Sequence, residues 1–187
     1  IKDINERGFT EVLADREAAE LSDTFWEVGL VQGLRTSSVS SPLFKAFLAA
    51  QACLGDKGFL SKDITVRDML THHGDIHHIF PREFLKKQGY TRGRYNQVAN
   101  LVCVQQEINI KIGSKNPNDY MADIFQQCQT GQPIYGVITD PGELAANFQA
   151  NALPQDQNLY HIDHYEDFLT RRREAMAEKI KRYYQNL

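Results

Sequence analysis

Residues 75–81 of this chain read DIHHIFP, and residues 99–104 read ANLVCV. Both contain short apolar runs of the kind that forms strands, and we place the two strands at about residues 75–79 and 99–104. The segment that follows, residues 105–112, has the pattern of a helix and contains Asn109. The order strand, strand, helix allows side chains from three successive elements to converge without long-range assembly.

Two adjacent histidines and two spaced asparagines in this stretch suggest a one-metal nuclease site. Cutting a phosphodiester requires a base that deprotonates water, a cation for the developing charge, and residues that hold both in place. His77 and His78 would point to opposite faces of a regular strand, whereas at a strand end or a bulge both can face one pocket. One imidazole would then bind the metal, while its neighbour, with an ordinary pKa of about 6.5, remains neutral enough to accept a proton. Taken singly, Asn100 would be a turn residue and Asn109 a surface helix residue, and only their spacing from the histidines argues otherwise.

Together these residues resemble the ββα-metal motif of HNH endonucleases, with HHIFP at residues 77–81. The resemblance implies that His78 is the general base and that Asn100 orients it through its amide oxygen. It also implies that His77 and Asn109 are the metal ligands, so that the motif reads His-Asn-Asn. The fold class that follows is α+β, a mainly α-helical chain containing a ββα-metal nuclease core.

Within that family the chain is most similar to the C-terminal HNH domain of GmrSD-like, modification-dependent restriction and anti-phage proteins. An HHIFP element and a Lys-Asn-Pro segment recur there, and residues 114–117 of this chain read SKNP. The specific match covers roughly residues 70–125. The resemblance implies DNA as the substrate and a preceding nucleotide-dependent domain or subunit. We expect that part to be missing, because the chain opens with Ile1 and shows no Gly-rich phosphate-cradling loop.

Mg²⁺ is the first expectation for the metal, because a sparse protein ligand set leaves water and phosphate to complete an octahedron. An imidazole ligand would also suit Mn²⁺, Ni²⁺ or Zn²⁺. Most HNH proteins place Asp where this chain has His77, so Asp75 is a candidate for an alternative ligand or for a partner that orients one. His72 and His73 are further candidate ligands, although loop histidines without a metal are the commoner case.

The formal net charge of −3 by itself argues against nucleic-acid binding. The segment 82–94 differs, because it carries five basic residues against the single acid Glu83, a local charge of +4. We expect these residues, and two lysines after the second strand, to contact phosphates rather than bases. The candidates for DNA contact are Arg82, Lys86, Lys87, Arg92, Arg94, Lys111 and Lys115. The alternative is a solvated charged loop with exposed helix lysines.

Length and composition are ordinary for a globular protein, with 187 residues of which 42% are hydrophobic and 24% charged. Such a chain can bury one good core, or a core with a small appended module. Cys53, Cys103 and Cys128 are far apart and form no Cys-x-x-Cys pair, which argues against a disulfide framework and a zinc knuckle. We expect Cys103 to pack in a strand. The sequence shows no bilayer-spanning apolar run and no signal pattern, so we expect a cytoplasmic protein without membrane contact.

Three regions are expected: a helical region at 1–70, the nuclease core at 71–128 and a C-terminal helical region at 129–187. The last region ends in a long charged helix over 160–185, where basic residues such as Arg171, Arg172 and Arg173 are nearly balanced by acids. A solvated, ion-paired helix face is the expectation there, with DNA backbone contact as the alternative. The other expected elements are a helix over 11–34 broken near Gly29 and Gly33, a helix from Pro42 to Leu54 ending at Gly55, a short helix over 64–70 capped by Asp63 or Thr65, helices over 117–127 and 141–150, and a linker over 130–139 with room for extended pairing.

Two other functions remain open from the sequence. One is a DNA-binding or partner-binding module whose HNH core is degenerate, which would keep the basic segment but show no metal-dependent turnover. The other is a structural zinc protein that uses His72, His73, His77 and His78. Four histidines within seven residues do not readily surround one tetrahedral ion without a distant partner, which disfavours the zinc reading.

Overall fold

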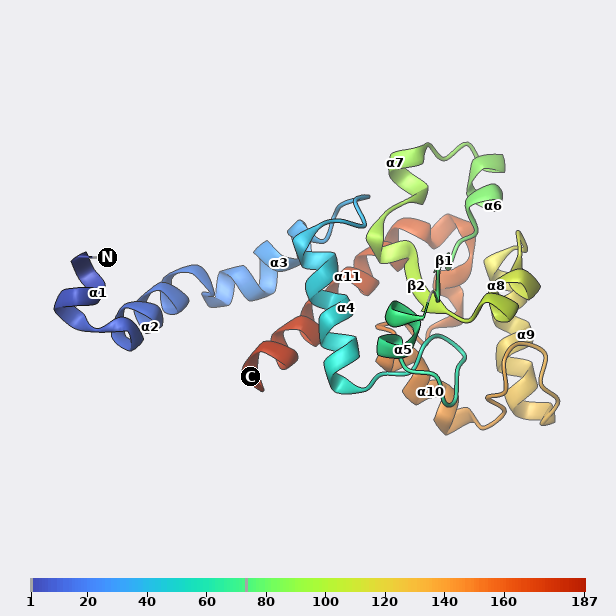
Figure 1. Ribbon diagram of the computed structural model, residues 1–187. Coiled ribbons are helices and arrows are strands. Elements are labelled where there is room, and N and C mark those ends of the chain that lie inside the picture. The colour runs from blue at the N-terminus through green and yellow to red at the C-terminus, as the bar shows by residue number, and fades with distance from the viewer. Residues whose placement is uncertain (1, 73) are drawn as a thin grey trace.

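The computed structural model describes residues 2–72 and 74–187, with the main chain only at residue 75, and it shows an α+β protein dominated by helices (Figure 1). This confirms the expected class of a mainly α-helical chain with a small sheet. The α-helices are α1 (Lys2–Arg7), α2 (Phe9–Glu20), α3 (Leu30–Gly33), α4 (Pro42–Leu54), α5 (Val66–Thr71), α6 (Arg82–Lys87), α7 (Arg92–Tyr95), α8 (Gln106–Ile112), α9 (Pro117–Thr130), α10 (Pro141–Ala150) and α11 (Tyr165–Gln185). A π-helical turn, η1 (Phe25–Gly29), and three 3-10 turns, η2 (Val98–Asn100), η3 (Gln157–Tyr160) and η4 (Ile162–His164), complete the helical elements.

The sheet is an antiparallel pair of β1 (Asp75–His78) and β2 (Leu101–Val104) at the centre of the molecule (Figure 1). His77 lies opposite Val102, and His78 lies opposite Leu101 at the end of the pair. All four residues of β2 are buried, which fits its continuous apolar run. The first strand is close to its predicted bounds, whereas the second begins at Leu101 because the two residues before it belong to the turn η2.

The segment between the strands is more ordered than the basic connection expected from the sequence. It folds into the two short helices α6 and α7, which lie together above the sheet in Figure 1. Leu85 of α6 and Tyr95 of α7 are buried, so each helix has an apolar anchor. The helix α8 follows β2 directly, as predicted, and packs against β1.

An aromatic core joins the sheet to the C-terminal helix. The ring of Phe80, just after β1, lies 4.7 Å from that of Tyr165 and 5.0 Å from that of Phe168, measured between centroids. Tyr160 in turn lies 5.5 Å from Phe168, and all four rings are buried. Because two of these aromatics belong to α11, that helix supports the chain on either side of the strand pair.

The capped helices agree well with the sequence. Helix α4 begins at Pro42 and ends at Gly55, whose φ of 72° is the left-handed conformation that favours glycine. Helix α5 has a complete capping box between Thr65 and Asp68. Helices α9 and α10 are capped by the residues that precede their first prolines. The expected linker after α9 has a bend over residues 134–137 and no strand among its described residues.

Two helical expectations were wrong in their bounds. The break in the N-terminal region falls at residues 21–22, after α2, rather than near Gly29, where the chain remains helical, whereas the helix does end at Gly33 as expected. The C-terminal helix begins at Tyr165 because two 3-10 turns occupy the residues that were expected to be its first turn.

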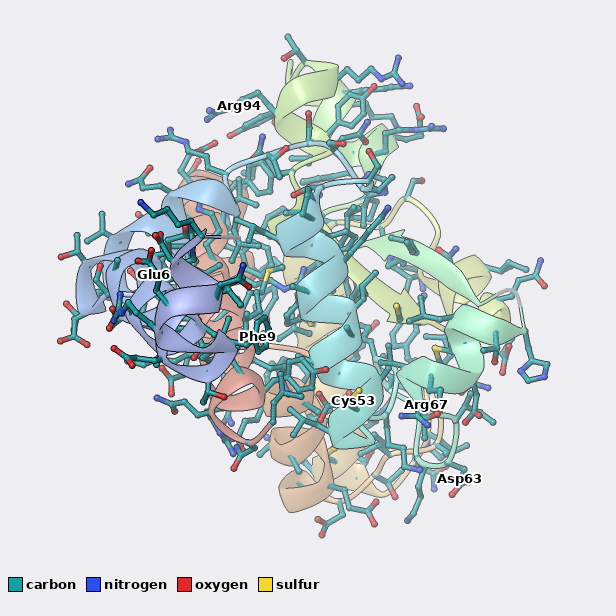
Figure 2. All side chains as sticks on the ribbon, turned by 60° about the vertical axis from the view of Figure 1, so that its left-hand side comes forward. Glu6, Phe9, Cys53, Asp63, Arg67 and Arg94 are labelled. Carbon is teal, nitrogen blue, oxygen red and sulfur yellow. The ribbon has the colours of Figure 1, made fainter. Side chains whose placement is uncertain are left out.

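Helices α1 and α2 form an arm that extends away from the rest of the molecule (Figure 1). The six residues of α1 are exposed, and Val12 is the buried residue of α2. Figure 2 shows Glu6 and Phe9 on this arm, on the opposite side of α4 from Arg67. None of the described helices is long and apolar enough to cross a membrane.

Candidate active site around His78

A small open pocket of about 250 Å³ lies where β1 ends. It brings together side chains from β1, the start of α6 and the turn after α8. Its walls are His77, His78, Pro81, Arg82, Glu83, Gly113 and Ser114. The two histidines therefore share one pocket, as expected for a strand end, although they are neighbours in a regular strand.

His78 is half-buried, and its ring is held from two sides. Its Nε2 lies 3.0 Å from Oδ1 of Asn96, the residue that ends α7. The neighbouring Tyr95 ring lies 6.4 Å away at an interplanar angle of 65°. Burial lowers the pKa of His78 below its usual value, the hydrogen bond with Asn96 raises it, and the positive charge of Arg82 lowers it further. The imidazole is therefore biased toward the neutral form that a proton acceptor needs.

Asn100 is fully buried in η2 and clamps the chain on both sides of the strand pair. Its Oδ1 accepts a hydrogen bond of 2.8 Å from the N–H of Phe80. Its Nδ2 donates to the carbonyl oxygens of Phe80 and Tyr95, both at 3.0 Å. The main chain adds a 2.8 Å hydrogen bond from the N–H of Ile79 to the carbonyl of Asn100. Asn100 thus fixes the main chain just after His78 and just before Asn96.

This geometry corrects the predicted role of Asn100 in detail. Its amide oxygen, which was expected to accept a hydrogen bond from the imidazole, accepts instead from a main-chain N–H. The amide that contacts the ring of His78 belongs to Asn96. No spacing along the chain distinguishes Asn96, because its approach to His78 depends on the turn formed by α7.

The two expected metal ligands lie on neighbouring elements. His77 is 5% exposed on β1, and Asn109 is half-buried on α8, the helix that packs against β1. The N–H of Gly113 donates to the carbonyl of Asn109 at 2.9 Å. Gly113, which lines the pocket, therefore lies one helical turn after Asn109. An imidazole nitrogen and an amide oxygen suit a divalent cation that completes its shell with water and phosphate.

The other candidate ligands add little to this pair. Among residues 2–72 and 74–187, the structure contains no group of three His, Cys, Asp or Glu side chains placed to hold a metal. Nδ1 of His72 lies 2.9 Å from the hydroxyl of Thr71 and 3.1 Å from the carbonyl oxygen of Asp68, so this ring is engaged at the end of α5. His73 and the side chain of Asp75 lie outside the described part of the chain.

The seven basic candidates for DNA contact are exposed, but they are not equivalent. Arg82 lines the pocket and shares Glu83 with Lys86, at 3.1 and 2.9 Å. Arg94, labelled on α7 in Figure 2, forms an ion pair with Glu166 of α11. A second group of two lysines gathers on Tyr135, outside the pocket. Nζ of Lys111 lies 6.0 Å from that ring, and Nζ of Lys115 lies 4.8 Å from it and 2.5 Å from its hydroxyl oxygen.

Two supports of the site were missed by sequence reasoning. The hydroxyl of Tyr120 on α9 donates to the carbonyl of Ile79 at 2.5 Å. Nη1 of Arg172 on α11 donates to the carbonyl of Ala99 at 2.8 Å. These contacts fix the residues directly after β1 and directly before Asn100. Periodicity could have identified both side chains as inward-facing, because each lies on the apolar face of its helix.

The burial of Arg172 also overturns part of the expected solvated face of α11. Arg172 is fully buried and Arg173 is 7% exposed, while Arg171 is exposed and pairs with Glu174 at 3.4 Å. Burial lowers the pKa of Arg172 to about 10. An isolated guanidinium is costly to bury, and here the carbonyls of Ala99 and Asn151 accept its hydrogen bonds.

Comparisons of the chain with protein-family models, with curated proteins and with solved structures found no match.

Proposed function

We propose that this chain is a metal-dependent endonuclease that hydrolyses phosphodiester bonds in DNA, with a ββα-metal core of the HNH type. The observation that carries the proposal is the pocket at the end of β1. There a half-buried histidine of lowered pKa, His78, stands beside a second histidine and Arg82. The order of β1, β2 and α8 along the chain supports a ββα arrangement in which α6 and α7 lie between the two strands.

In the proposed reaction His78 takes a proton from a water molecule, which attacks phosphorus in line with the leaving oxygen. Arg82 binds a non-bridging phosphate oxygen and orients the substrate. Asn100 holds the main chain around His78 in place through Phe80 and Tyr95. His78 and Arg82 both line the pocket, whereas Asn100 acts through the main chain of Phe80 and Tyr95.

His77 and Asn109 are the residues that would hold the divalent cation, with Mg²⁺ as the first choice and Mn²⁺, Ni²⁺ or Zn²⁺ as alternatives. When bound, such an ion supplies charge stabilisation for the non-bridging and leaving oxygens. The sparse donor set leaves room for phosphate and water in the coordination shell. For the same reason we expect weak binding that dialysis reverses, unlike that of a structural zinc site.

Further parts of the proposal rest on the resemblance of the motif to GmrSD-like proteins. They are a role in restriction or anti-phage defence in the cytoplasm and control by a nucleotide-dependent domain or subunit. The exposed cations of α6 and α7 support DNA as the partner, because they give that end of the molecule an excess of positive charge.

The test is nicking of supercoiled plasmid in the presence of Mg²⁺, Mn²⁺ or Ni²⁺, with EDTA as the metal-free control. We expect metal-dependent nicking that His77→Ala and Asn109→Ala shift to higher metal concentration. Asn118→Ala, an exposed substitution on α9, is the matched control and should cut like the wild type.

The alternative function is a DNA-binding or partner-binding module with a degenerate core, which the exposed basic helices alone would support. A gel shift on the same plasmid separates the two functions. Salt-sensitive binding without nicking, on both unmodified and base-modified DNA and with a nucleotide present, would favour the binding module.

A further inference from the structure

We propose that Asn96 fixes the tautomer of His78 with the proton on Nε2, so that Nδ1 is the nitrogen that accepts the proton from water. The inference rests on the proposed nuclease function and names which atom of the base acts. It makes Asn96 a positioning residue that works through the imidazole.

The argument begins with the two ring nitrogens. A neutral imidazole has one N–H and one lone pair, and the hydrogen bond made by one nitrogen decides which is which. Nε2 of His78 lies 3.0 Å from Oδ1 of Asn96. An amide oxygen only accepts hydrogen bonds, so Nε2 carries the proton in this contact. The lone pair is therefore on Nδ1.

The position of Asn96 is fixed independently of the imidazole. Its N–H donates to the carbonyl of Arg92 at 3.1 Å, which closes the turn of α7. The hydroxyl of Tyr165 on α11 donates to the carbonyl of Arg94 at 2.9 Å and ties this turn to the core. Asn96 therefore presents its amide to the ring of His78 from a supported turn.

The Asn100 clamp ties the two partners to each other. Its Nδ2 bonds to the carbonyl of Tyr95, next to Asn96, and to the carbonyl of Phe80, two residues after His78. One buried amide thus holds both the segment that carries the base and the segment that orients it. A shift of either segment would have to break a buried hydrogen bond, which is costly.

For the second nitrogen to act on a substrate, the residue must also border the pocket. His78 lines the pocket together with Arg82, whereas Asn96 reaches the ring from α7. In the reaction an O–H bond of water breaks, and its proton forms the N–H bond on Nδ1. The oxygen bonds to phosphorus as the bond to the leaving oxygen breaks, and the leaving oxygen takes a proton from solvent. The imidazolium keeps its Nε2–H bond to Asn96 throughout.

The test is the ¹⁵N NMR spectrum of histidine-labelled full-length chain with Mg²⁺ present, at a pH where the rings are neutral. The resonances of His78 are assigned by their loss in His78→Gln. The wild type should show a protonated Nε2 and an unprotonated Nδ1. Asn96→Leu, which keeps the volume but removes the acceptor, should move both resonances toward a mixture of tautomers. Asn96→Asp, which keeps an oxygen at this position, should retain the Nε2–H form.

Two results would overturn the proposal. One is a wild-type ring protonated on Nδ1. The other is an Nε2–H tautomer that persists unchanged in Asn96→Leu. Plasmid nicking adds the functional readout: we expect kcat to fall about 10-fold or more in Asn96→Leu with KM little changed, because orientation of the base is lost rather than DNA binding. Wild-type kcat in a variant with mixed tautomers would contradict the role in catalysis. A wild type that never nicks DNA would reject the nuclease function, while the spectrum would still decide the tautomer.

Discussion

Asn100 has no exposed surface, and its amide oxygen and nitrogen both bond to main-chain groups. One N–H and two carbonyl oxygens depend on it. Removing a buried amide with this many partners costs more free energy than losing one hydrogen bond, because each buried partner is left unpaired. The side chain therefore links the position of His78 to the stability of the protein.

We predict that Asn100→Ala lowers the free energy of unfolding by about 2–4 kcal/mol. The physical reason is that the N–H of Phe80 and the carbonyls of Phe80 and Tyr95 lose their partner inside the protein. Urea denaturation of the variant, with Asn118→Ala as the exposed control, measures the effect. A midpoint for Asn100→Ala equal to that of the control would show that the clamp carries no stability.

Cys103 gives a prediction about pH. Burial in β2 raises the pKa of its thiol from 9.0 to about 11. The unfolded chain therefore releases this proton first as the pH rises above 9, and stability present below pH 9 is lost between pH 9 and 11. Denaturation across this range should show a loss about 2 kcal/mol larger in the wild type than in Cys103→Ala. Equal losses in the two proteins would mean that the thiol titrates normally in the folded state.

Single residues differ in how far the sequence could identify them. The histidine pair and Asn109 could be singled out because their spacing is local, and His77 and His78 do line one pocket. The role of Asn96 could not be predicted, because its contact with His78 joins residues 18 positions apart through a turn. Asn100 was identified as a residue of the site, but its actual partners depend on the three-dimensional path of the chain after β1.

Among the secondary-structure elements, the support of η2 by α11 explains why an arginine is buried in the C-terminal helix. Arg172 donates to the carbonyl of Ala99 in η2 and, at 3.3 Å, to that of Asn151 beyond α10. One side chain of α11 thereby links η2 to the residue that ends α10. Hydrophobic packing alone would not hold these carbonyls in place, since they need a donor.

We predict that Arg172→Ala lowers the free energy of unfolding by about 3–5 kcal/mol, through the cavity and the unpaired carbonyls it leaves. Arg171→Ala, at an exposed position on the same helix, should cost less than about 0.5 kcal/mol. Arg172→Met should fall between them, because methionine fills the space and removes the buried charge. Thermal and urea unfolding of the three variants provide the measurement, and similar stabilities for Arg172→Ala and Arg171→Ala would refute this role of α11.

The sequence predicted elements best where the signal was local. Pro42 with Gly55, and Thr65 with Asp68, mark helix ends through caps that need no distant contact. The short helices α6 and α7 and the turn η2 escaped prediction because each is one turn or little more. Such short helices are held by buried anchors such as Leu85 and Tyr95 rather than by their own propensity.

Taken as a whole, the molecule has one aromatic core and an arm of little burial. We predict that removal of residues 1–20 leaves the melting temperature within a few degrees of the wild type, because the arm contributes only Val12 to the buried set. Removal of residues 1–34 is the matched comparison. It also deletes Leu30 and Leu34, which are buried in the main core, and should unfold the protein at a clearly lower temperature. Equal melting temperatures for the two truncations would contradict this division.

The net charge is also a property of the whole molecule. The net charge of −3 is compatible with DNA binding only if the cations gather on one side, and the exposed helices α6 and α7 supply such a group at one end of the molecule (Figure 1). Within this group Arg82 and Lys86 pair with Glu83, and Arg94 pairs with Glu166. Lys87 and Arg92 are the remaining exposed cations, and their charges face solvent most directly. Sequence alone located the segment, whereas the ion pairs that moderate it required the fold.

The most direct test of the proposed nuclease is single-turnover cleavage of supercoiled plasmid by the wild type and by His78→Ala, at protein concentrations that saturate the DNA in both. We predict metal-dependent cleavage by the wild type and a rate about 10²–10⁴-fold lower in the variant, with unchanged DNA binding, because only the proton acceptor is removed. Full metal-dependent cleavage by His78→Ala would contradict the assignment of His78 as the general base.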